Sequence, residues 1–239
     1  MNQAALKKKI FAEICQIKNF PEITPTYVSV GAIPFRPNSR RFYSYPKLFG
    51  LLVDYLAPVV VKIKPDRLAG GATAGIPLAT ALSLKTGIPM IYVRKEAKTK
   101  GGVSHGMIEG DYQRGERVIL IEDILSDGKT KVLFVKNLHQ ADLKVINILT
   151  ITQTHNRLDP VFKRLIKQKK ISLYCFATLE ELTLAQIKAK AIPSLLAPLL
   201  LDYVRRPESW QNNPKKWRPY CRALKKLKIR IPDFLKKYE

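Results

Sequence analysis

The residues best suited to chemistry lie in one run near the middle of the chain, residues 118–130, which read VILIEDILSDGKT. Four apolar residues of the kind found in strands precede two adjacent carboxylates, Glu122 and Asp123. A hydroxyl, a glycine and a second hydroxyl follow at Ser126, Gly128 and Thr130. Backbone amides at a tight turn that opens a helix bind phosphate, and carboxylates accept hydrogen bonds from vicinal sugar hydroxyls. The run therefore indicates a sugar-phosphate site, and a turn merely capped by the two carboxylates is the simpler alternative.

A second candidate is the basic run of residues 94–100, RKEAKTK, which holds four cations in seven residues and is followed by two glycines. A flexible cationic loop of this kind is suited to closing over an anionic leaving group. The alternative is a solvated basic loop, which is common in a chain that carries 42 Lys and Arg against 19 Asp and Glu. The position of the run, directly after a predicted strand, favours the functional interpretation.

These residues need elements that hold them together, and the middle of the chain supplies alternating strands and helices. Short apolar segments predict strands at 67–69, 89–93, 118–121, 145–150 and 171–176. The segments between them predict helices at 77–86, 131–139 and 160–168, and a long polar loop at 94–111. Such alternation predicts an α/β fold, an open twisted mostly parallel sheet flanked by helices. Ligands bind beyond the carboxyl ends of such strands, where both candidate runs fall.

The flanking segments predict further elements. Residues 4–18 and 48–61 have apolar residues at helical spacing, whereas residues 19–46, with five prolines, predict short strands and loops. Residues 205–239 hold twelve Lys or Arg and three Asp or Glu in helical segments broken by prolines.

We therefore expect three parts in the chain. These are an N-terminal helix with a small hood at 1–46, a core at 47–180, and a basic, proline-containing helical extension at 181–239.

The candidate site resembles that of a known family, the type I phosphoribosyltransferases, which bind phosphoribosyl diphosphate (PRPP). Residues 122–130 resemble the PRPP signature of this family, and its orotate phosphoribosyltransferases are the most similar members. Three further segments carry the resemblance in the family's order. They are TYV at 26–28 in the hood, AGGATAGIPLA at 69–79 as the diphosphate loop, and IYVRKEAK at 91–98 as a strand with the mobile loop. The resemblance covers residues 20–180.

The resemblance implies transfer of phosphoribose from PRPP to orotate, giving orotidine 5′-monophosphate and diphosphate. It implies Mg²⁺ as cofactor and a homodimer in which the mobile loop crosses the interface. Lys98 would be the catalytic lysine, Arg94 and Asp123 would also act in catalysis, and Asp123 would hold Mg²⁺ through water. The residues implied to bind PRPP are Thr73, Gly75, Arg94, Lys95, Lys98, Lys100, Glu122, Asp123, Ser126, Asp127, Gly128, Lys129 and Thr130. Tyr27 and Arg157 are the candidates for contact with the base.

The chain also departs from the family pattern. Lys100 stands where the family has a His, and Asp127 places a negative charge in the phosphate turn, where Lys129 could offset it. The hood has FPEI at 20–23 in place of Lys-Ser-Gly, and Gly31 in place of an Arg. Because these hood segments contact the base in the family, a PRPP-dependent transferase for another base is an alternative.

The amino-acid composition excludes several classes of protein. Hydrophobic residues make up 46% and charged residues 26% of the 239 residues, which excludes a disordered chain. Cys15, Cys175 and Cys221 are widely spaced, which predicts free thiols and neither a zinc site nor a disulfide framework. No apolar stretch reaches the ~18 residues of a membrane span. We therefore expect a cytoplasmic protein without a membrane partner.

The formal net charge of +23 attracts polyanions. One alternative is therefore a regulator of this fold that binds nucleic acid through the extension, with Trp210, Trp217 and Tyr220 beside its cations. The simpler interpretation is that the extension is solvated and packs on the sheet or on a neighbouring subunit. The presence of Arg94 and Lys98 favours an enzyme.

Overall fold

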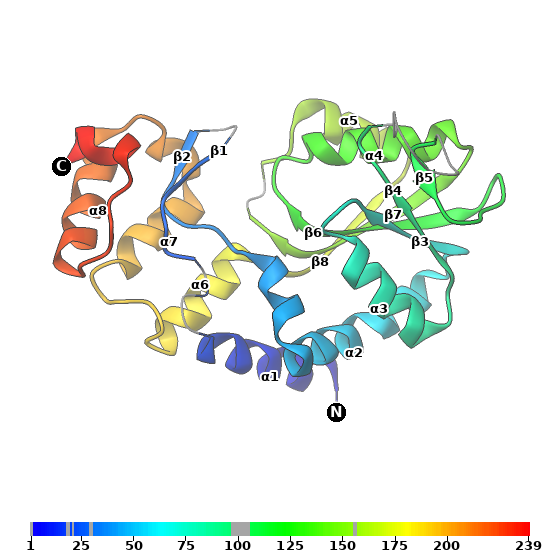
Figure 1. The fold of residues 1–239 in the computed structure, drawn as a ribbon, viewed down its shortest axis with the longest axis horizontal. Coiled ribbons are helices and arrows are strands. Elements are labelled where there is room, and N and C mark those ends of the chain that lie inside the picture. The colour runs from blue at the N-terminus through cyan, green and yellow to red at the C-terminus, as the bar shows by residue number, and fades with distance from the viewer. Residues whose placement is uncertain (1, 18–19, 21, 29–30, 97–105, 155–156) are drawn as a thin grey trace. The chain divides into compact units, whose positions relative to one another are not determined.

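The computed structural model describes residues 2–17, 20, 22–28, 31–96, 106–154 and 157–239 (Figure 1). The chain divides into two compact units. Unit 1 consists of residues 1–7 and 39–177, and unit 2 of residues 8–38 and 178–239. Residues of the expected hood and of the expected extension thus lie together in unit 2.

Unit 1 is built on a six-stranded sheet with the strand order β5-β4-β3-β6-β7-β8. Its strands are β3 (Arg67–Gly71), β4 (Met90–Val93), β5 (Ile108–Glu109), β6 (Arg117–Leu125), β7 (Lys144–Gln153) and β8 (Ser172–Thr178). The pairs β3–β4, β3–β6 and β6–β7 are parallel, and β5 pairs antiparallel with β4. The mostly parallel sheet predicted from the alternation of elements is confirmed.

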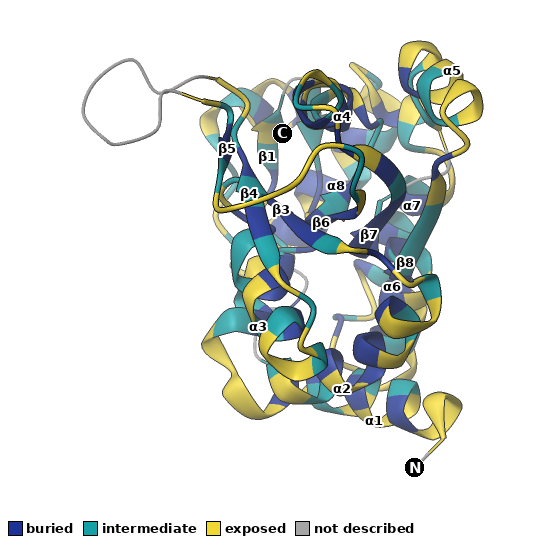
Figure 2. Cartoon of the chain, turned by 90° about the vertical axis from the view of Figure 1, so that its right-hand side faces the viewer, coloured by how far each residue is buried: buried dark blue, intermediate teal, exposed yellow. Residues whose placement is uncertain are grey.

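Helices cover both faces of this sheet. Figure 1 shows α2 (Pro46–Ile63) and α3 (Ile76–Thr86) on one side, and α4 (Lys129–Gln140) and α5 (Pro160–Gln168) on the other. The strands between them are largely buried (Figure 2). Phe134 of α4 and Phe162 of α5 pack in one apolar cluster with Leu120 of β6 and Ile148 of β7. With both faces covered, the carboxyl edge of the strands is where a ligand can approach.

Two details of the sheet differ from the prediction. Strand β6 continues to Leu125, because β7 pairs with it as far as that residue, so Glu122 and Asp123 lie inside the strand and not after it. Residues 108–109 form β5 inside the segment expected to be a continuous polar loop. A strand of two residues is too short to produce an alternating pattern that a sequence reading can detect.

Unit 2 combines a short hairpin with helices from the end of the chain. The hairpin pairs β1 (Thr26–Val28) with β2 (Gly31–Ile33), and α1 (Gln3–Gln16) enters this unit at residue 8. The remaining elements are α6 (Leu179–Lys188), α7 (Ala197–Arg205), the 3₁₀ turn η2 (Pro207–Trp210), α8 (Pro214–Lys226) and the 3₁₀ turn η3 (Asp233–Tyr238).

The core of unit 2 is aromatic. Trp210, Trp217 and Tyr220 are fully buried and meet edge to face, with ring centroids 5.2–5.9 Å apart. Phe35 belongs to the same cluster, and the Tyr220 hydroxyl donates a hydrogen bond of 2.6 Å to the carbonyl oxygen of Pro34. These rings therefore stabilise unit 2 and are not exposed for stacking on nucleic-acid bases.

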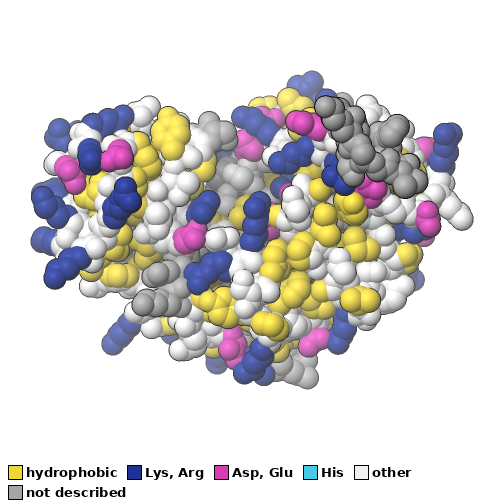
Figure 3. All heavy atoms as spheres, viewed as in Figure 1, with side chains coloured by type: hydrophobic (Ala, Val, Ile, Leu, Met, Phe, Trp, Pro, Cys, Tyr) yellow, Lys and Arg dark blue, Asp and Glu magenta, His cyan; other side chains and the backbone are white. Residues whose placement is uncertain are grey.

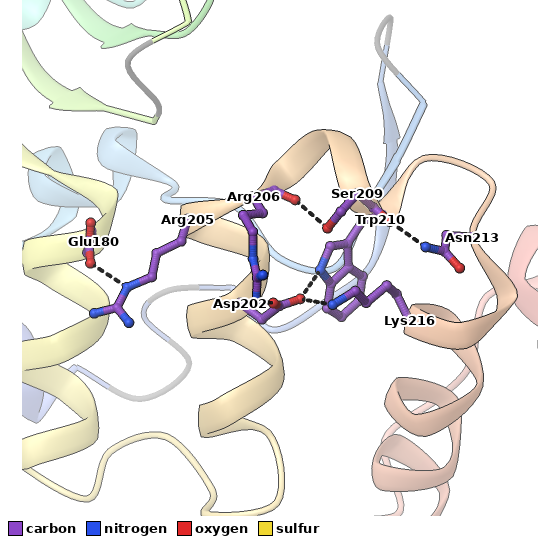
Figure 4. Close-up of polar contacts among 8 residues, drawn as sticks. All are labelled: Glu180, Asp202, Arg205, Arg206, Ser209, Trp210, Asn213 and Lys216. Carbon is purple, nitrogen blue, oxygen red and sulfur yellow. Dashed lines mark hydrogen bonds and ion pairs between the residues drawn. The ribbon is translucent and has the colours of Figure 1, made fainter.

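Asp202 ties three elements of unit 2 together (Figure 4). Its carboxylate, in α7, accepts hydrogen bonds from Trp210 Nε1 at 2.9 Å and from Lys216 Nζ at 2.7 Å, and it also pairs with Arg206. The neighbouring Arg205 forms an ion pair of 2.7 Å with Glu180 of α6. A carboxylate with three donors is well compensated for its partial burial.

Cys15, Cys175 and Cys221 are free cysteines, as predicted. Within the described ranges, no helix combines the length and the apolar composition that crossing a bilayer requires.

Candidate active site

The two carboxylates of the predicted site lie side by side in β6 and are both buried. Consecutive residues of a strand point to opposite faces, so Glu122 and Asp123 have different surroundings. Each of them is paired with a cation that the sequence reading did not include, Lys131 for Glu122 and Arg40 for Asp123.

Glu122 is held by a lysine of the helix that follows the turn. Lys131, in the first turn of α4, donates a hydrogen bond to Glu122 Oε2, and the two side chains are only 8% and 6% exposed. Gly71 lies so close to Glu122 that a Cβ there would overlap the carboxylate. Burial raises the pKa of Glu122, whereas the charge of Lys131 and its hydrogen bond act in the opposite direction. The pair therefore places a carboxylate and its counter-ion together in a buried position.

Asp123 lies at the edge of the sheet and meets a residue from an earlier part of the chain. Its Oδ1 accepts a hydrogen bond of 2.8 Å from the amide of Ile124, and its Oδ2 lies 3.1 Å from Nε of Arg40. Arg40 is in the 3₁₀ turn η1 (Ser39–Ser44), which precedes α2. Tyr43 of the same turn has a raised pKa, because it is buried and close to Asp123 and Glu122.

The glycine-rich segment after β3 packs tightly against β6. The Gly75 amide donates to the Gly71 carbonyl at 2.8 Å, and the amide of Ala72 donates to the Val93 carbonyl of β4 at 2.8 Å. A Cβ at Gly75 would overlap the carbonyl of Ile121, so only glycine fits there. The Ala72–Thr73 peptide bond is cis, and Thr73 is exposed. The segment thus forms a rigid, glycine-lined loop beside the carboxylates.

The predicted phosphate turn joins β6 to α4. Gly128 has φ +88°, which favours glycine, and a Cβ there would overlap the ring of Phe162 in α5. The Asp127 carboxylate accepts a hydrogen bond of 3.1 Å from the amide of Lys129 and lies 3.5 Å from its Nζ. The charge of Asp127 is therefore partly offset by Lys129, as the sequence reading considered.

α5 also supports this turn, through the residue that caps its N-terminus. The amide of Asp159 donates a hydrogen bond of 2.8 Å to the Asp127 carbonyl, and the Asp159 side chain caps α5. Ser126 and Thr130, the two hydroxyl residues of the turn, are half-buried. The turn is therefore held on both sides, by α4 and by α5.

The basic loop is described only at its ends. Lys98 and Lys100 lie outside the described residues, and Lys95 is exposed. Arg94 forms an ion pair of 3.1 Å with Glu109 of β5, and its guanidinium lies 5.3 Å from the centre of the Tyr92 ring. Asn137 of α4 donates a hydrogen bond of 2.7 Å to the Arg94 carbonyl. Arg94, the first residue of the basic run, is therefore held in place at the end of β4, next to the glycine-rich segment that hydrogen-bonds to β4.

The two residues predicted to contact the base belong to different units of the chain. Tyr27 belongs to unit 2, is 69% exposed and meets Phe234 edge to face. Arg157 is an exposed residue of unit 1 that follows β7. The predicted residues that unit 1 gathers along the strand ends are Thr73, Gly75, Arg94, Lys95, Glu122, Asp123, Ser126, Asp127, Gly128, Lys129 and Thr130.

Sequence reasoning missed Arg40, Tyr43 and Lys131. Lys131 could have been found, because a helix that starts at the turn brings its first-turn residues back over the preceding strand. Arg40 and Tyr43 gave no such signal, since they are separated from Asp123 by some eighty residues of chain.

The chemistry of these groups fits Mg²⁺ that arrives with a phosphorylated substrate. Mg²⁺ usually keeps several waters and binds through one or two carboxylates together with substrate phosphates. The described ranges contain no group of three or more His, Cys, Asp or Glu side chains that could hold a metal ion. Asp123, which the sequence predicts to hold Mg²⁺ through water, lies at the carboxyl edge of the sheet with its carboxylate paired to Arg40.

Comparison with known proteins agrees with this geometry. Residues 50–176 match the phosphoribosyl transferase domain. The orotate phosphoribosyltransferase of Ruegeria sp. is 30% identical over 219 residues, which cover 89% of this chain and 94% of that protein. The enzyme of that name from Fusobacterium nucleatum is 34% identical over 128 residues, 53% of this chain and 60% of that protein.

Solved structures share the fold. Leishmania donovani UMP synthase superposes with a TM-score of 0.65 at 28% identity, covering 85% of this chain but only 42% of that longer protein. Mycobacterium tuberculosis orotate phosphoribosyltransferase in complex with PRPP has a TM-score of 0.57 at 17% identity, covering 74% of this chain and 98% of that one. With the domain match covering more than half of its residues, the chain belongs to the phosphoribosyltransferase family.

Proposed function

We propose that this protein transfers phosphoribose from PRPP to orotate, giving orotidine 5′-monophosphate and diphosphate. The observation that carries the proposal is the grouping of Asp123, the Gly71–Gly75 loop and the Ser126–Thr130 turn on neighbouring strand ends of one parallel sheet. PRPP has a ribose, a diphosphate and a 5′-phosphate. Carboxylates suit the ribose hydroxyls, and the backbone amides of the loop and of the turn suit the diphosphate and the 5′-phosphate.

The reaction breaks the bond between C1 of the ribose and the diphosphate oxygen, so positive charge develops on the ribose and negative charge on the diphosphate. Glu122 and Asp123 hold the ribose hydroxyls and favour the positive charge. The turn at 126–130 anchors the 5′-phosphate and so fixes C1. The 71–75 loop binds the diphosphate through backbone amides.

The leaving group also needs cations. We assign this role to the basic loop, with Lys98 as the catalytic lysine and Arg94, Lys95 and Lys100 beside it. The chemistry that Mg²⁺ supplies when bound is neutralisation of charge on the diphosphate. Lys100 binds anions well but is a weaker proton donor than a His near neutral pH.

Orotate is proposed as the acceptor because a relative named for it aligns with 89% of this chain. The runner-up is another base, because the hood differs from the family pattern at residues 20–23 and at Gly31. A panel of bases separates the two.

We further propose a homodimer in which the basic loop crosses to the partner subunit. Large apolar side chains on α2 and α3 support this, since Val61 is 52% and Leu84 is 84% exposed. Figure 3 shows hydrophobic side chains gathered over the region of α3. Apolar surface of this kind is typical of a protein–protein interface.

The nucleic-acid regulator is the weaker alternative. The aromatic residues that would stack on bases are buried in unit 2. The exposed cations of α8 remain, and they would bind a phosphate backbone without regard to sequence. The three free thiols support a cytoplasmic location, where thiols stay reduced.

The proposal is tested by following the absorbance of orotate with purified protein, Mg²⁺ and PRPP. We expect turnover by the wild type and a loss of at least a hundredfold in kcat for Lys98→Ala, because a leaving-group cation is removed. Lys163→Ala, which removes an exposed cation from α5, should leave the rate unchanged. Turnover of a different base in the panel would replace orotate as the acceptor. Absence of turnover with every base would overturn the enzymatic function.

A further inference from the structure

The 3₁₀ turn η1 lies across the carboxyl edge of the sheet and is attached to three different strand ends. The Ser39 hydroxyl donates a hydrogen bond of 3.0 Å to Thr152 Oγ1 at the end of β7, with both residues buried. The Tyr43 hydroxyl donates a hydrogen bond of 2.5 Å to the Ala74 carbonyl in the glycine-rich loop after β3. Between these two attachments, Arg40 meets Asp123 of β6.

Arg40 is held by an ion pair and is also accessible. Its side chain is 67% exposed, whereas the Asp123 side chain that it contacts is 9% exposed. The contact is made through Nε, 3.1 Å from Oδ2. The guanidinium therefore lies at the outer rim of the site, held in place by a buried carboxylate and by a turn that is anchored at both ends.

Under the proposed function, the acceptor arrives beside this position. C1 of the phosphoribose has to lie between the carboxylate that holds the ribose hydroxyls and the loop that holds the diphosphate. η1 contacts both of these, through Arg40 at Asp123 and through Tyr43 at Ala74. A group that attacks C1 consequently comes close to Arg40. A guanidinium binds a carboxylate with two parallel hydrogen bonds, which an ammonium group cannot do.

We propose that Arg40 is the residue that recognises an acceptor carrying a carboxylate. When ribose hydroxyls bind Asp123, the guanidinium turns from Oδ2 to the carboxylate of the acceptor, and it thereby discriminates orotate from a base without that group. This inference rests on the proposed function, and it concerns the acceptor half of the same site.

The test compares steady-state kinetics of Arg40→Met and Arg40→Lys with orotate and with uracil, which lacks the carboxylate. Arg40→Met should raise KM for orotate by about 10- to 100-fold, as expected for loss of a charge-assisted pair. KM for PRPP should stay within about twofold. The ratio of kcat/KM for orotate to kcat/KM for uracil should fall by the same factor as kcat/KM for orotate. Arg40→Lys should recover part of the loss, because it restores charge without the two parallel bonds.

Arg41→Met is the matched control. Arg41 is in the same turn, and its guanidinium donates to the Tyr45 hydroxyl at 3.2 Å. The Arg41→Met variant should leave KM for orotate, KM for PRPP and the preference for orotate over uracil unchanged. If an active wild type keeps its preference for orotate after Arg40→Met, or if KM for PRPP rises as much as KM for orotate, the assignment of Arg40 is wrong and the proposed function stands. If the wild type does not turn over orotate, the proposed function fails and the assignment falls with it.

Discussion

Glu122 and Lys131 form a buried ion pair, which is costly for a protein to keep unless something requires it. Removing two charges from water carries a penalty that their attraction repays only when the geometry is good. Here the Lys131 side chain reaches Glu122 from the first turn of α4, and Gly71 of the glycine-rich segment leaves room for the carboxylate. We interpret Lys131 as the residue that positions Glu122 for the ribose, since it touches Glu122 and not the open edge of the sheet.

Lys131→Met should lower the free energy of unfolding by about 3–5 kcal/mol, because it leaves a buried carboxylate without a partner. Urea denaturation measures this loss, and Lys136→Met, on the exposed side of the same helix, should cost little. The double variant Lys131→Met/Glu122→Gln should regain most of the stability but stay slow in turnover. A Lys131→Met variant as stable and as active as the wild type would refute the interpretation.

The strands that carry the site are joined at their other ends by a second ion pair. Arg67, the first residue of β3, donates two hydrogen bonds of 2.7 Å to Glu116, which precedes β6. Both side chains are mostly buried, and the Gln113 amide also donates to Glu116. Hydrogen bonding from Arg67 holds the pKa of Glu116 below its usual range. The contact fixes the relative position of the two strands that bring the glycine-rich loop to Asp123.

Glu116→Gln should therefore lower the free energy of unfolding at neutral pH by about 1.5–3 kcal/mol, the usual contribution of hydrogen bonds to a charged group. The stabilisation is present above the pKa of an unfolded Glu, about 4.3, and is lost as the pH falls through the lower pKa of the folded state. The difference between wild type and variant should shrink over that acid range in urea denaturation. Asp233→Asn removes a well-exposed ion pair with Lys236 and should have little effect at any pH. A pH-independent difference for Glu116→Gln would show that the charge is not responsible.

Local sequence pattern predicted most elements of the sheet, but not the short strand β5 and not the contacts between distant elements. The apolar run before Glu122 and the Gly128 turn predicted β6, the turn and α4 correctly, because strand period and turn chemistry are local properties. The ends of β6 were set by pairing with β7, which is not a local property. Arg40 reaches Asp123 across 83 positions, and Tyr220 reaches Pro34 across 186. No periodicity in the sequence encodes such contacts.

For the whole molecule, the proposed dimer would bury the exposed apolar surface of α3 against the partner subunit. Leu84→Lys should convert the dimer to a monomer in sedimentation velocity, since a charge is costly to bury in an apolar interface. Its thermal stability as a monomer should be little changed, because Leu84 is 84% exposed. Turnover should fall together with the dimer fraction if the basic loop acts across the interface. A wild type that sediments as an active monomer would refute the dimer and the shared loop together.

The proposed function requires that the strand ends around Asp123 bind PRPP. Calorimetric titration of the protein with PRPP in the presence of Mg²⁺ tests it without requiring the acceptor. We expect saturable binding by the wild type, at least tenfold weaker binding by Asp123→Asn because it loses the charged acceptor of the ribose hydroxyls, and unchanged binding by Asp54→Asn, which alters an exposed carboxylate on α2. Absence of PRPP binding by a folded wild type, or equal binding by Asp123→Asn, would contradict the account.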